Sequence, residues 1–320
     1  MESRKLIKLG NSSFAIALPK DWIEKSGLKK GDKIYVERNS NGEIIISPEF
    51  KKLNGEKRSI INVDNEDEKT IKRKFTNDYI SGSSSFEFTG KTIKEKSRKI
   101  KNLIGDYIGC EISEETANSI IVKDFFNFEE TDMNSFIKRI ENNILEMFDI
   151  ILSSLEKQTV SKKEIEEAIE IDSDINKFYF LNSRIMSLGL DNPALLNVLK
   201  IGTKDLFNNW WITFHLEHAG DNLKSIISAF DSEKLDEKIK NKLSPIFKEL
   251  KEKYRNALHL LYEKNDKQAF EVLDNGKRAL AMCEDLTKSK NSFLSIIGEK
   301  LYRVDNAVYQ IIKMISNLKS

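Results

Sequence analysis

The residues with the clearest potential for chemistry are carboxylates at the edge of apolar helical stripes. Glu217 and Asp221 lie one helical turn apart, and like charges at that spacing cost about 0.2–0.5 kcal/mol even on an exposed helix. A position beside an aromatic core should cost more unless a cation compensates. Asp305 lies beside the apolar stripe of the last predicted helix. Since helical bundles build metal sites from such carboxylates, we predict ligands for Fe, Mn, Mg or Zn.

The competing interpretation is that Glu217, Asp221 and Asp305 are boundary residues paired with lysine or arginine. His215 and His218 flank Glu217, but they are three residues apart, whereas zinc protease motifs need two histidines at a spacing of four. The chain has 3 histidines, and none lies beside a nucleophile in a turn. We therefore predict that the protein is not an enzyme, and we regard a carboxylate-metal hydrolase as the weaker alternative.

A second group of candidate residues is basic and lies at the amino-terminal end. Residues 1–52 contain 11 Lys and Arg against 7 Asp and Glu, a net charge of 11 − 7 = +4, whereas the whole chain carries +1. The near-neutral total argues against a protein that coats nucleic acid or anionic membranes through bulk charge. The basic charge of residues 1–52 is nevertheless compatible with local contact to DNA. The alternative is a module that only dimerises, with its lysines solvated.

The elements that would position these basic residues are short. Strand-like runs are expected at 14–18, 34–36 and 44–46. Pro19 opens a short helical stretch that Gly27 ends, and Asn41-Gly42 is a favourable hairpin turn. A segment of about fifty residues has little core of its own, which favours a core shared in a dimer.

Residues 4–48, RKLIKLGNSSFAIALPKDWIEKSGLKKGDKIYVERNSNGEIIISP, resemble the SpoVT/AbrB swapped-hairpin domain in the GNS turn, the Leu-Pro-Lys helix start and the final hairpin. The resemblance implies a swapped-hairpin β-barrel built by an obligate homodimer, with DNA contacts on the first strand and its turn. It assigns DNA binding to Arg4, Lys5, Lys8, Asn11, Ser12 and Lys20. We expect this domain to cover residues 1–52.

Residues 53–130 are predicted to form a small α/β domain. Strand-like runs are expected at 59–63, 84–88 and 119–123, alternating with helix-like runs at 66–80 and 92–108. No phosphate-cradling glycine pattern is present, and the role of this domain is left open.

In residues 131–320 the apolar residues recur at helical spacing, which predicts an all-helical region. We expect two helical units, at about 131–230 and 235–319. Asp221-Asn222 recurs as Asp305-Asn306, 84 residues later, which indicates a weak internal repeat. The four prolines are expected at element boundaries, leaving the helices uninterrupted.

The stretch FHLEHAGDNLKSII is similar to the E-x-x-x-D motif of PhoU-type phosphate uptake regulators, whose fold is a pair of three-helix bundles. The segment LYRVDNAVYQII keeps Asp305, but Leu301 stands where the pattern has glutamate. In AIEIDSDINKFYF, Asp172 matches and Asn176 replaces the second aspartate. The resemblance thus adds Asp172 to the implied metal ligands.

The order of the three parts resembles archaeal PhoU-like regulators. It implies a phosphate-uptake regulator that binds DNA through the first domain and senses or docks through the last, with a phosphate ABC transporter ATPase or a signalling protein as partner. The alternative is a metal-binding docking protein that inhibits the transporter without touching DNA. With 2 cysteines, no CxxC pair and no apolar run of about 18 residues, we expect a cytoplasmic protein without a membrane span.

Overall fold

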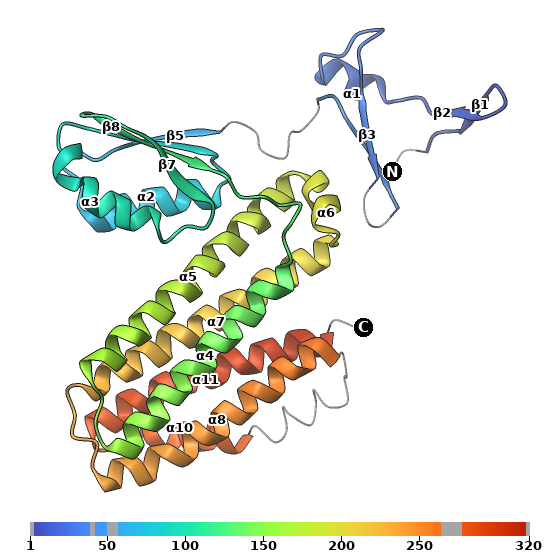
Figure 1. The fold of residues 1–320 in the computed structure, drawn as a ribbon. Helices are drawn as coiled ribbons and strands as arrows, with labels where there is room; N and C mark the ends of the chain where they lie inside the picture. Colours follow the sequence, from blue (N-terminus) through green and yellow to red (C-terminus); the bar gives the residue numbers. More distant parts are fainter. Residues whose placement is uncertain (1–2, 39–41, 50–56, 264–276, 318–320) are drawn as a thin grey trace.

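The computed structural model describes residues 3–38, 42–49, 57–263 and 277–317 of the 320-residue chain. In chain order it contains a small β module, an α/β domain and a region of long helices (Figure 1). The three parts agree in type with the sequence predictions.

The amino-terminal module consists of two hairpins and one helix. Strands β1 (Ile7–Leu9) and β2 (Ser13–Ala15) pair antiparallel, and the turn between them begins at Gly10, whose φ of 69° suits glycine. Helix α1 (Lys20–Lys25) starts after Pro19 and is followed by Gly27, also at positive φ. Strands β3 (Tyr35–Arg38) and β4 (Ile44–Ser47) form the second hairpin. In the predicted turn, Asn41 lies outside the described residues.

The α/β domain is a four-stranded sheet covered by two helices. Its elements are β5 (Arg58–Asn62), α2 (Glu68–Ile80), β6 (Ser85–Thr89), α3 (Ile93–Ile104), β7 (Cys110–Glu115) and β8 (Ser119–Asp124). The strand order is β5-β6-β8-β7, with only the β5–β6 pair parallel. Helices α2 and α3 lie on the same side of the sheet (Figure 1).

Strand β7 is the element of this domain that the sequence analysis missed. It lies at the sheet edge, and in the run CEISEE only Cys110 is buried. An exposed edge strand lacks the apolar alternation by which strands are recognised. The other strand and helix predictions fall within a few residues of the observed bounds.

The carboxyl-terminal region is all helical. Its described helices are α4 (Met133–Lys157), α5 (Lys162–Asp191), α6 (Pro193–Leu199), α7 (Thr203–Phe230), α8 (Glu237–Glu263), α10 (Lys277–Thr287) and α11 (Ser292–Asn317). The apolar stripes beside the predicted carboxylate ligands run from Ile212 to Phe230 and from Leu301 to Ile315, and both stripes are buried. One continuous apolar cluster joins α4, α5 and α7 to α8, α10 and α11. The two predicted units therefore share a core.

The expectation that every proline lies at a boundary is wrong for Pro245, which lies inside α8. Proline removes one backbone hydrogen bond from a helix interior and usually kinks or ends it. Here Leu243, Ile246 and Phe247 around it are all buried. Tertiary packing of this face outweighs the local preference. Pro193, by contrast, begins α6, as predicted for a boundary.

The α/β domain is fixed to the helical region by a buried arginine on α5. Arg184 is 2% exposed, and its guanidinium donates to the carbonyls of Tyr79 and Ser83 and to Asp124 at 2.6 Å. Phe180, one turn earlier on α5, stacks on Tyr107 at 5.3 Å. The guanidinium of Arg184 is planar and donates to several acceptors of the α/β domain at once. These contacts fix the orientation of the α/β domain relative to α5.

None of the described helices combines the length and the apolarity needed to cross a membrane.

Candidate functional sites

The predicted DNA-binding residues lie on or next to the first hairpin. Arg4 and Lys5 precede β1, Lys8 is in β1, and Asn11 and Ser12 form its turn, all with exposed side chains. Lys20 is the first residue of α1 and lies 3.6 Å from Glu24, with both side chains mostly exposed. Three of the six residues therefore belong to the β1–β2 hairpin and two directly precede it, whereas Lys20 belongs to a separate element that already has an acidic partner.

The β3–β4 hairpin presents an apolar face to solvent. Val36 pairs with Ile46 in the hairpin. Ile44 lies two residues before Ile46 in β4, and Ile34 lies just before β3, two residues before Val36, so side-chain alternation places all four on one face. Val36 is 59% exposed and Ile44 is 68% exposed. An exposed apolar face of this kind is typical of an interaction surface.

The β1–β2 hairpin carries exposed apolar side chains on both of its faces. Lys8 pairs with Phe14 on one face, and Ile7 pairs with Ala15 on the other. Phe14 is 62% exposed and Ile7 is 53% exposed. Among the described residues 3–49, no side chain with an assigned burial class is buried. The module thus contains strands without the core that strands require.

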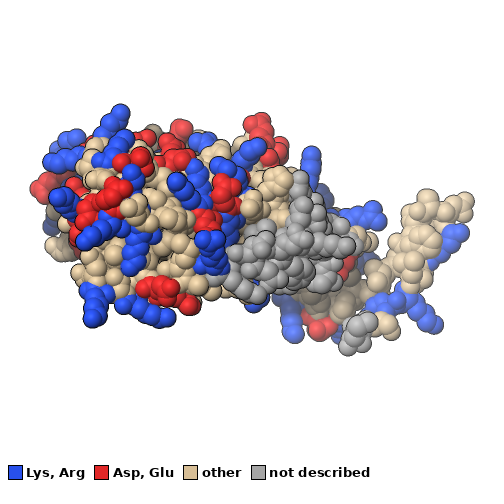
Figure 2. Space-filling model, turned by 90° about the horizontal axis from the view of Figure 1, so that it is seen from below, with Lys and Arg blue, Asp and Glu red and all other residues tan. Residues whose placement is uncertain are grey.

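The distribution of charge differs between the two ends of the molecule. Figure 2 shows Lys and Arg interspersed with Asp and Glu over the helical body, whereas the outermost part of the amino-terminal end shows blue and tan surface on this face. A mixed surface gives no long-range attraction for an anion, and a basic end does.

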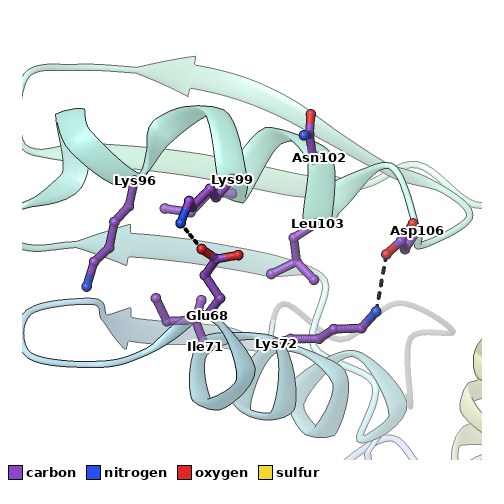
Figure 3. Close-up of a pocket in the computed structure, with 9 residues that line it drawn as sticks. Glu68, Ile71, Lys72, Lys96, Lys99, Asn102, Leu103 and Asp106 are labelled. Carbon is purple, nitrogen blue, oxygen red and sulfur yellow. Dashed lines mark hydrogen bonds and ion pairs between the residues drawn. The ribbon is translucent and has the colours of Figure 1, made fainter.

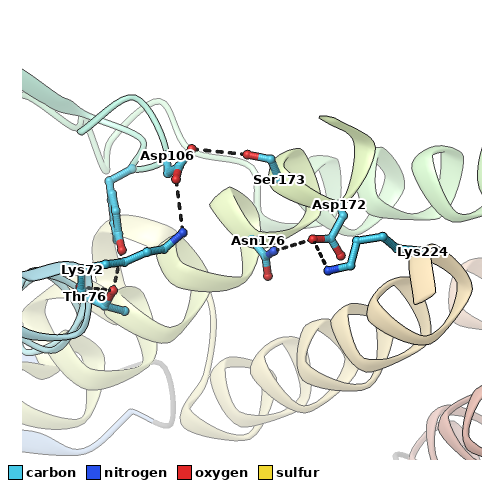
Figure 4. Close-up of polar contacts among 8 residues, drawn as sticks. Lys72, Thr76, Asp106, Asp172, Ser173, Asn176 and Lys224 are labelled. Atoms are coloured by element: carbon cyan, nitrogen blue, oxygen red, sulfur yellow. Dashed lines mark hydrogen bonds and ion pairs between the residues drawn. The ribbon is translucent and has the colours of Figure 1, made fainter. Parts of the chain in front are cut away.

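Three of the four predicted metal ligands come together between α5 and α7. The ammonium of Lys224 donates to Asp172 Oδ2 and to Asp221 Oδ1, each at 2.7 Å. Asn176, one turn after Asp172, donates to the same Oδ2 at 3.1 Å. Figure 4 shows Lys224 reaching from α7 towards Asp172 on α5. The carboxylates therefore surround a lysine of their own chain.

Glu217 belongs to this group through its electrostatics. Burial, together with the charges of Asp221 and Asp172, raises the pKa of its carboxyl to about 7, against the opposing effect of Lys224. Burial also raises the pKa of Asp172, against hydrogen bonding and charge from Lys224, which lower it. The same two aspartates raise the pKa of Lys224 although burial lowers it. Asp172 and Glu217 are thus partly desolvated carboxyls, and Lys224 is the cation beside them.

The fourth predicted ligand, Asp305, lies in a separate ion pair. It is 2% exposed and accepts a hydrogen bond from Lys253 of α8 at 2.6 Å. Burial raises the pKa of Asp305, and the neighbouring Lys253 lowers it. The prediction that Asp305 joins Glu217, Asp221 and Asp172 in one site is not supported by these contacts.

The acidic places lack the donor arrangement of a metal centre. Among the described residues, no group of three or more His, Cys, Asp and Glu side chains has the arrangement of a metal site. In both acidic places an ammonium stands at hydrogen-bonding distance where a metal would have to bind. The residues present therefore do not fit the metal site that the PhoU resemblance implies.

The two histidines beside Glu217 contact aromatic rings. His215 packs edge-on against Trp211 at 4.8 Å, and His218 packs against Phe214 at 4.4 Å. Burial, with a contribution from His218, lowers the pKa of His215 to about 4. His215 is accordingly neutral at physiological pH and forms part of the packing of α7.

A cavity of about 280 Å³ lies between α2 and α3 on the α/β domain (Figure 3). Lys99 pairs with Glu68, and Lys72 lies 3.3 Å from Asp106. Lys96 donates to the backbone carbonyls of Val63 and Glu66 at 2.6 and 2.7 Å. Each lysine lining the cavity thus already has an acceptor within the domain.

A larger cavity of about 650 Å³ lies where the first turns of α4 and α7 meet the end of α8. Its lining contains lysines and aspartates together with the buried Asn208. Because charges of both signs face it, the lining selects no class of ligand.

Sequence reasoning missed the lysines that complete these acidic places. Lys224 follows Asp221 by three residues, a spacing that brings two side chains of a helix together, so the pair was detectable. Lys253 and Asp305 come from different helices and carry no spacing signal. Arg184 and Asp124 are likewise far apart in sequence.

The comparisons with known proteins concern only the amino-terminal module. Residues 7–53 match the family described as antidote-toxin recognition MazE, bacterial antitoxin. Neither a curated protein nor a solved structure matches the chain. The first module is accordingly an AbrB/MazE-like domain of the DNA-binding type, followed by a mostly helical region.

Proposed function

We propose that this protein is a DNA-binding regulator that acts as a homodimer through its amino-terminal module. The observation that carries the proposal is the combination of exposed apolar strand faces and exposed basic residues on the β1–β2 hairpin. The match to a MazE-type family over residues 7–53 supports the same assignment.

The dimer would supply the core that the single module lacks. Val36, Ile44 and Phe14 are more than half exposed, and fully burying one side chain of this kind contributes about 1.5–3 kcal/mol. A second copy of the same module offers the same apolar faces, and closed two-fold pairing covers both at once. We propose the swapped-hairpin barrel as the form of this pairing.

DNA would be contacted by the paired hairpins. Lys8, Arg4 and Lys5 would neutralise phosphates, and Asn11 and Ser12 at the turn would reach the base edges or backbone. With few arginines in the module, sequence preference would rest largely on DNA shape. Two such hairpins related by two-fold symmetry suit a DNA site with the same symmetry.

The regulated process that we propose is phosphate uptake. The support is the similarity of the segment around Glu217 and Asp221 to the E-x-x-x-D motif of PhoU-type regulators, together with the all-helical region in which it lies. The helical region would sense or dock, without enzymatic activity. A phosphate ABC transporter ATPase or a signalling protein is the proposed partner of this region.

The experiment that tests DNA binding is fluorescence anisotropy of the full chain with a labelled promoter-length duplex over a range of NaCl concentrations. We expect binding at low salt that weakens steeply as salt rises, because phosphate contacts release counterions. Absent binding, or binding that does not depend on salt, would contradict the proposal.

The phosphate assignment needs a separate test, since DNA binding alone does not support it. Phosphate uptake by cells with and without the protein would be compared under phosphate-rich and phosphate-poor conditions. We expect uptake to lose its response to external phosphate when the protein is removed. If DNA binding holds and uptake is unchanged, the protein regulates another process.

A further inference from the structure

The two edges of the sheet in the α/β domain differ in their protection against a further strand. Among the described strands, β5 pairs with β6 alone and β7 pairs with β8 alone. Each edge strand therefore presents a row of backbone N–H and C=O groups away from the sheet. Such a row is a template for another strand unless charged side chains, proline or a bulge protect it.

Strand β7 is a protected edge. A register shift between Ile112 and Glu114 interrupts its pairing with β8. Its residues after Cys110 are all exposed, and three of them are glutamates. Two β7 strands paired antiparallel about Ser113 would place Glu111 opposite Glu115, and like charges directly opposite each other are destabilising. The bulge and the glutamates thus disfavour pairing at β7.

Strand β5 lacks this protection. It pairs with β6 in an unbroken register from Arg58 to Asn62. Ile60, at its centre, is 65% exposed. The one charged residue of the strand, Arg58, lies 2.6 Å from Glu87 of the neighbouring strand β6. The cation of β5 is therefore paired within its own sheet, and the centre of the edge is apolar.

The β5 edge is complementary to a second copy of itself. Antiparallel pairing about Ile60 places Ile60 opposite its counterpart and Arg58 opposite Asn62, so no like charges face each other. Ile61 is buried in the core of the domain, and alternation puts Ile60 on the opposite, open face of the sheet. Pairing would cover two exposed isoleucines on that face.

The position of β5 in the chain favours a second copy as the occupant of this edge. Only residues 50–56 separate the described part of the amino-terminal module from the α/β domain. A chain of seven residues spans at most about 25 Å. Paired modules would therefore keep two β5 strands near each other, and such tethering raises their effective concentration. This step rests on the proposed dimer of the module, since a pair of short strands alone is marginal.

We propose that the β5 strands of two chains pair antiparallel about Ile60 in the dimer and join the two four-stranded sheets into one. The α/β domain is fixed to α5 by the contacts of Arg184 with Ser83 and Asp124. Pairing at β5 consequently sets the arrangement of the two helical regions as well. The α/β domain thus transmits the two-fold symmetry of the module to the helices.

The test is disulfide formation by Ile60→Cys in the full chain under mild oxidation, followed on non-reducing gels. Directly opposite residues of an antiparallel pair have Cα atoms about 4.5–5.5 Å apart, which suits a disulfide. Most of the protein should therefore become a covalent dimer. Cys110 and Cys283 are buried, so the wild type should give no cross-link. Ile60 is exposed, and its replacement should not disturb folding.

Two further cysteine variants test the edge and the register. Ser113→Cys places a thiol at an exposed position of the β7 edge and should give no cross-link. Arg58→Cys lies on the same strand and face as Ile60. Pairing about Ile60 offsets the two copies of residue 58 by four residues, about 14 Å along the strand, so Arg58→Cys should give none either.

Sedimentation of Ile60→Cys in reducing buffer separates this proposal from the proposed function. Two chains that form no cross-link on oxidation would overturn β5 pairing alone and leave the edge to a strand of another protein. Equally fast cross-linking of Ser113→Cys or Arg58→Cys would also overturn it. A single chain at all concentrations would contradict the module dimer and β5 pairing together. The expected result is a cross-link that is lost when Val36→Asp is combined with Ile60→Cys.

Discussion

The amino-terminal module and the helical region differ in how far they bury their apolar side chains within the single chain. In the helical region the apolar stripes of six long helices share one core, and even the interior carboxylates have lysine partners within the chain. In the module, strands and one helix form, but their apolar side chains stay at the surface. One part has its core within the single chain, and we propose that the other obtains its core from a second copy.

This difference shows where to look for interactions. Exposed apolar residues scattered singly on a surface need no explanation, but two hairpins with exposed apolar faces in about fifty residues do. A complete region offers surface chemistry only, whereas an incomplete one implies a binding partner of matching shape. The predictions below test this contrast, beginning with the largest expected effect.

The largest effect should follow from opening the buried pair of the helical region. Lys253→Met leaves Asp305 buried and without its cation, which should lower the free energy of unfolding by about 3–5 kcal/mol. Urea denaturation followed by circular dichroism measures this loss. Lys240→Met removes a pair whose Glu156 side chain is 75% exposed, and it should cost under about 1 kcal/mol. Equal losses of unfolding free energy in the two variants would contradict the view that Lys253 compensates the buried charge of Asp305.

The next effect should appear in the amino-terminal module. Val36→Asp puts a charge on the exposed face of β3 in each of two copies. Because each buried valine contributes about 1.5 kcal/mol or more, the dimer should weaken at least about 100-fold. Light scattering over a concentration series measures it. Ile169→Asp changes a similarly exposed apolar residue on α5 and should leave the mass unchanged; dissociation there instead would place the interface on the helices.

A smaller effect should appear in DNA binding. Lys8→Ala removes one proposed phosphate contact from each copy, so the slope of log K against log salt should decrease by about 2 for a dimer. Anisotropy titrations at four NaCl concentrations measure the slope. Lys157→Ala, at an exposed pair of the helical region, should leave it unaltered. A smaller slope for Lys157→Ala and an unchanged slope for Lys8→Ala would indicate that the helical region, and not the amino-terminal module, contacts DNA.

The smallest effect should be a pH dependence that belongs to the helical region. Burial raises the pKa of Glu217 from 4.5 to about 7 in the folded protein. The folded state therefore binds this proton more tightly than the unfolded state, and the stabilising contribution is fully present below pH 4.5 and lost as pH rises through about 7. Urea midpoints measured from pH 5 to 8 should fall more steeply for wild type than for Glu217→Gln. Parallel curves would show that Glu217 does not titrate in this range.

Sequence patterns were sufficient for elements whose periodicity reflects burial. The stripe from Ile212 to Phe230 is regular because one face of α7 packs against neighbouring helices, and its burial follows the prediction. Strand β7 was missed because an edge strand with exposed acidic side chains has no such periodicity. Pro245 was misplaced because the packing of α8 is stronger than the local preference of proline.

The candidate sites could be predicted only where the partners are close in sequence. The hairpin that carries Lys8, Asn11 and Ser12 is local, and the structure places them together. Asp172 and Asp221 share Lys224, whereas Asp305 forms a separate pair. Its partner Lys253 comes from another helix, and only tertiary structure brings the two together.

The central claim is that the amino-terminal module is completed by a second copy of the chain. Sedimentation equilibrium of the full-length protein tests it most directly, because it gives the mass in solution without a label or a partner. We predict a species of two 36.9 kDa chains that becomes a single chain in Val36→Asp while the helical circular dichroism is retained. A wild-type protein that sediments as one 36.9 kDa chain at all accessible concentrations would contradict the account.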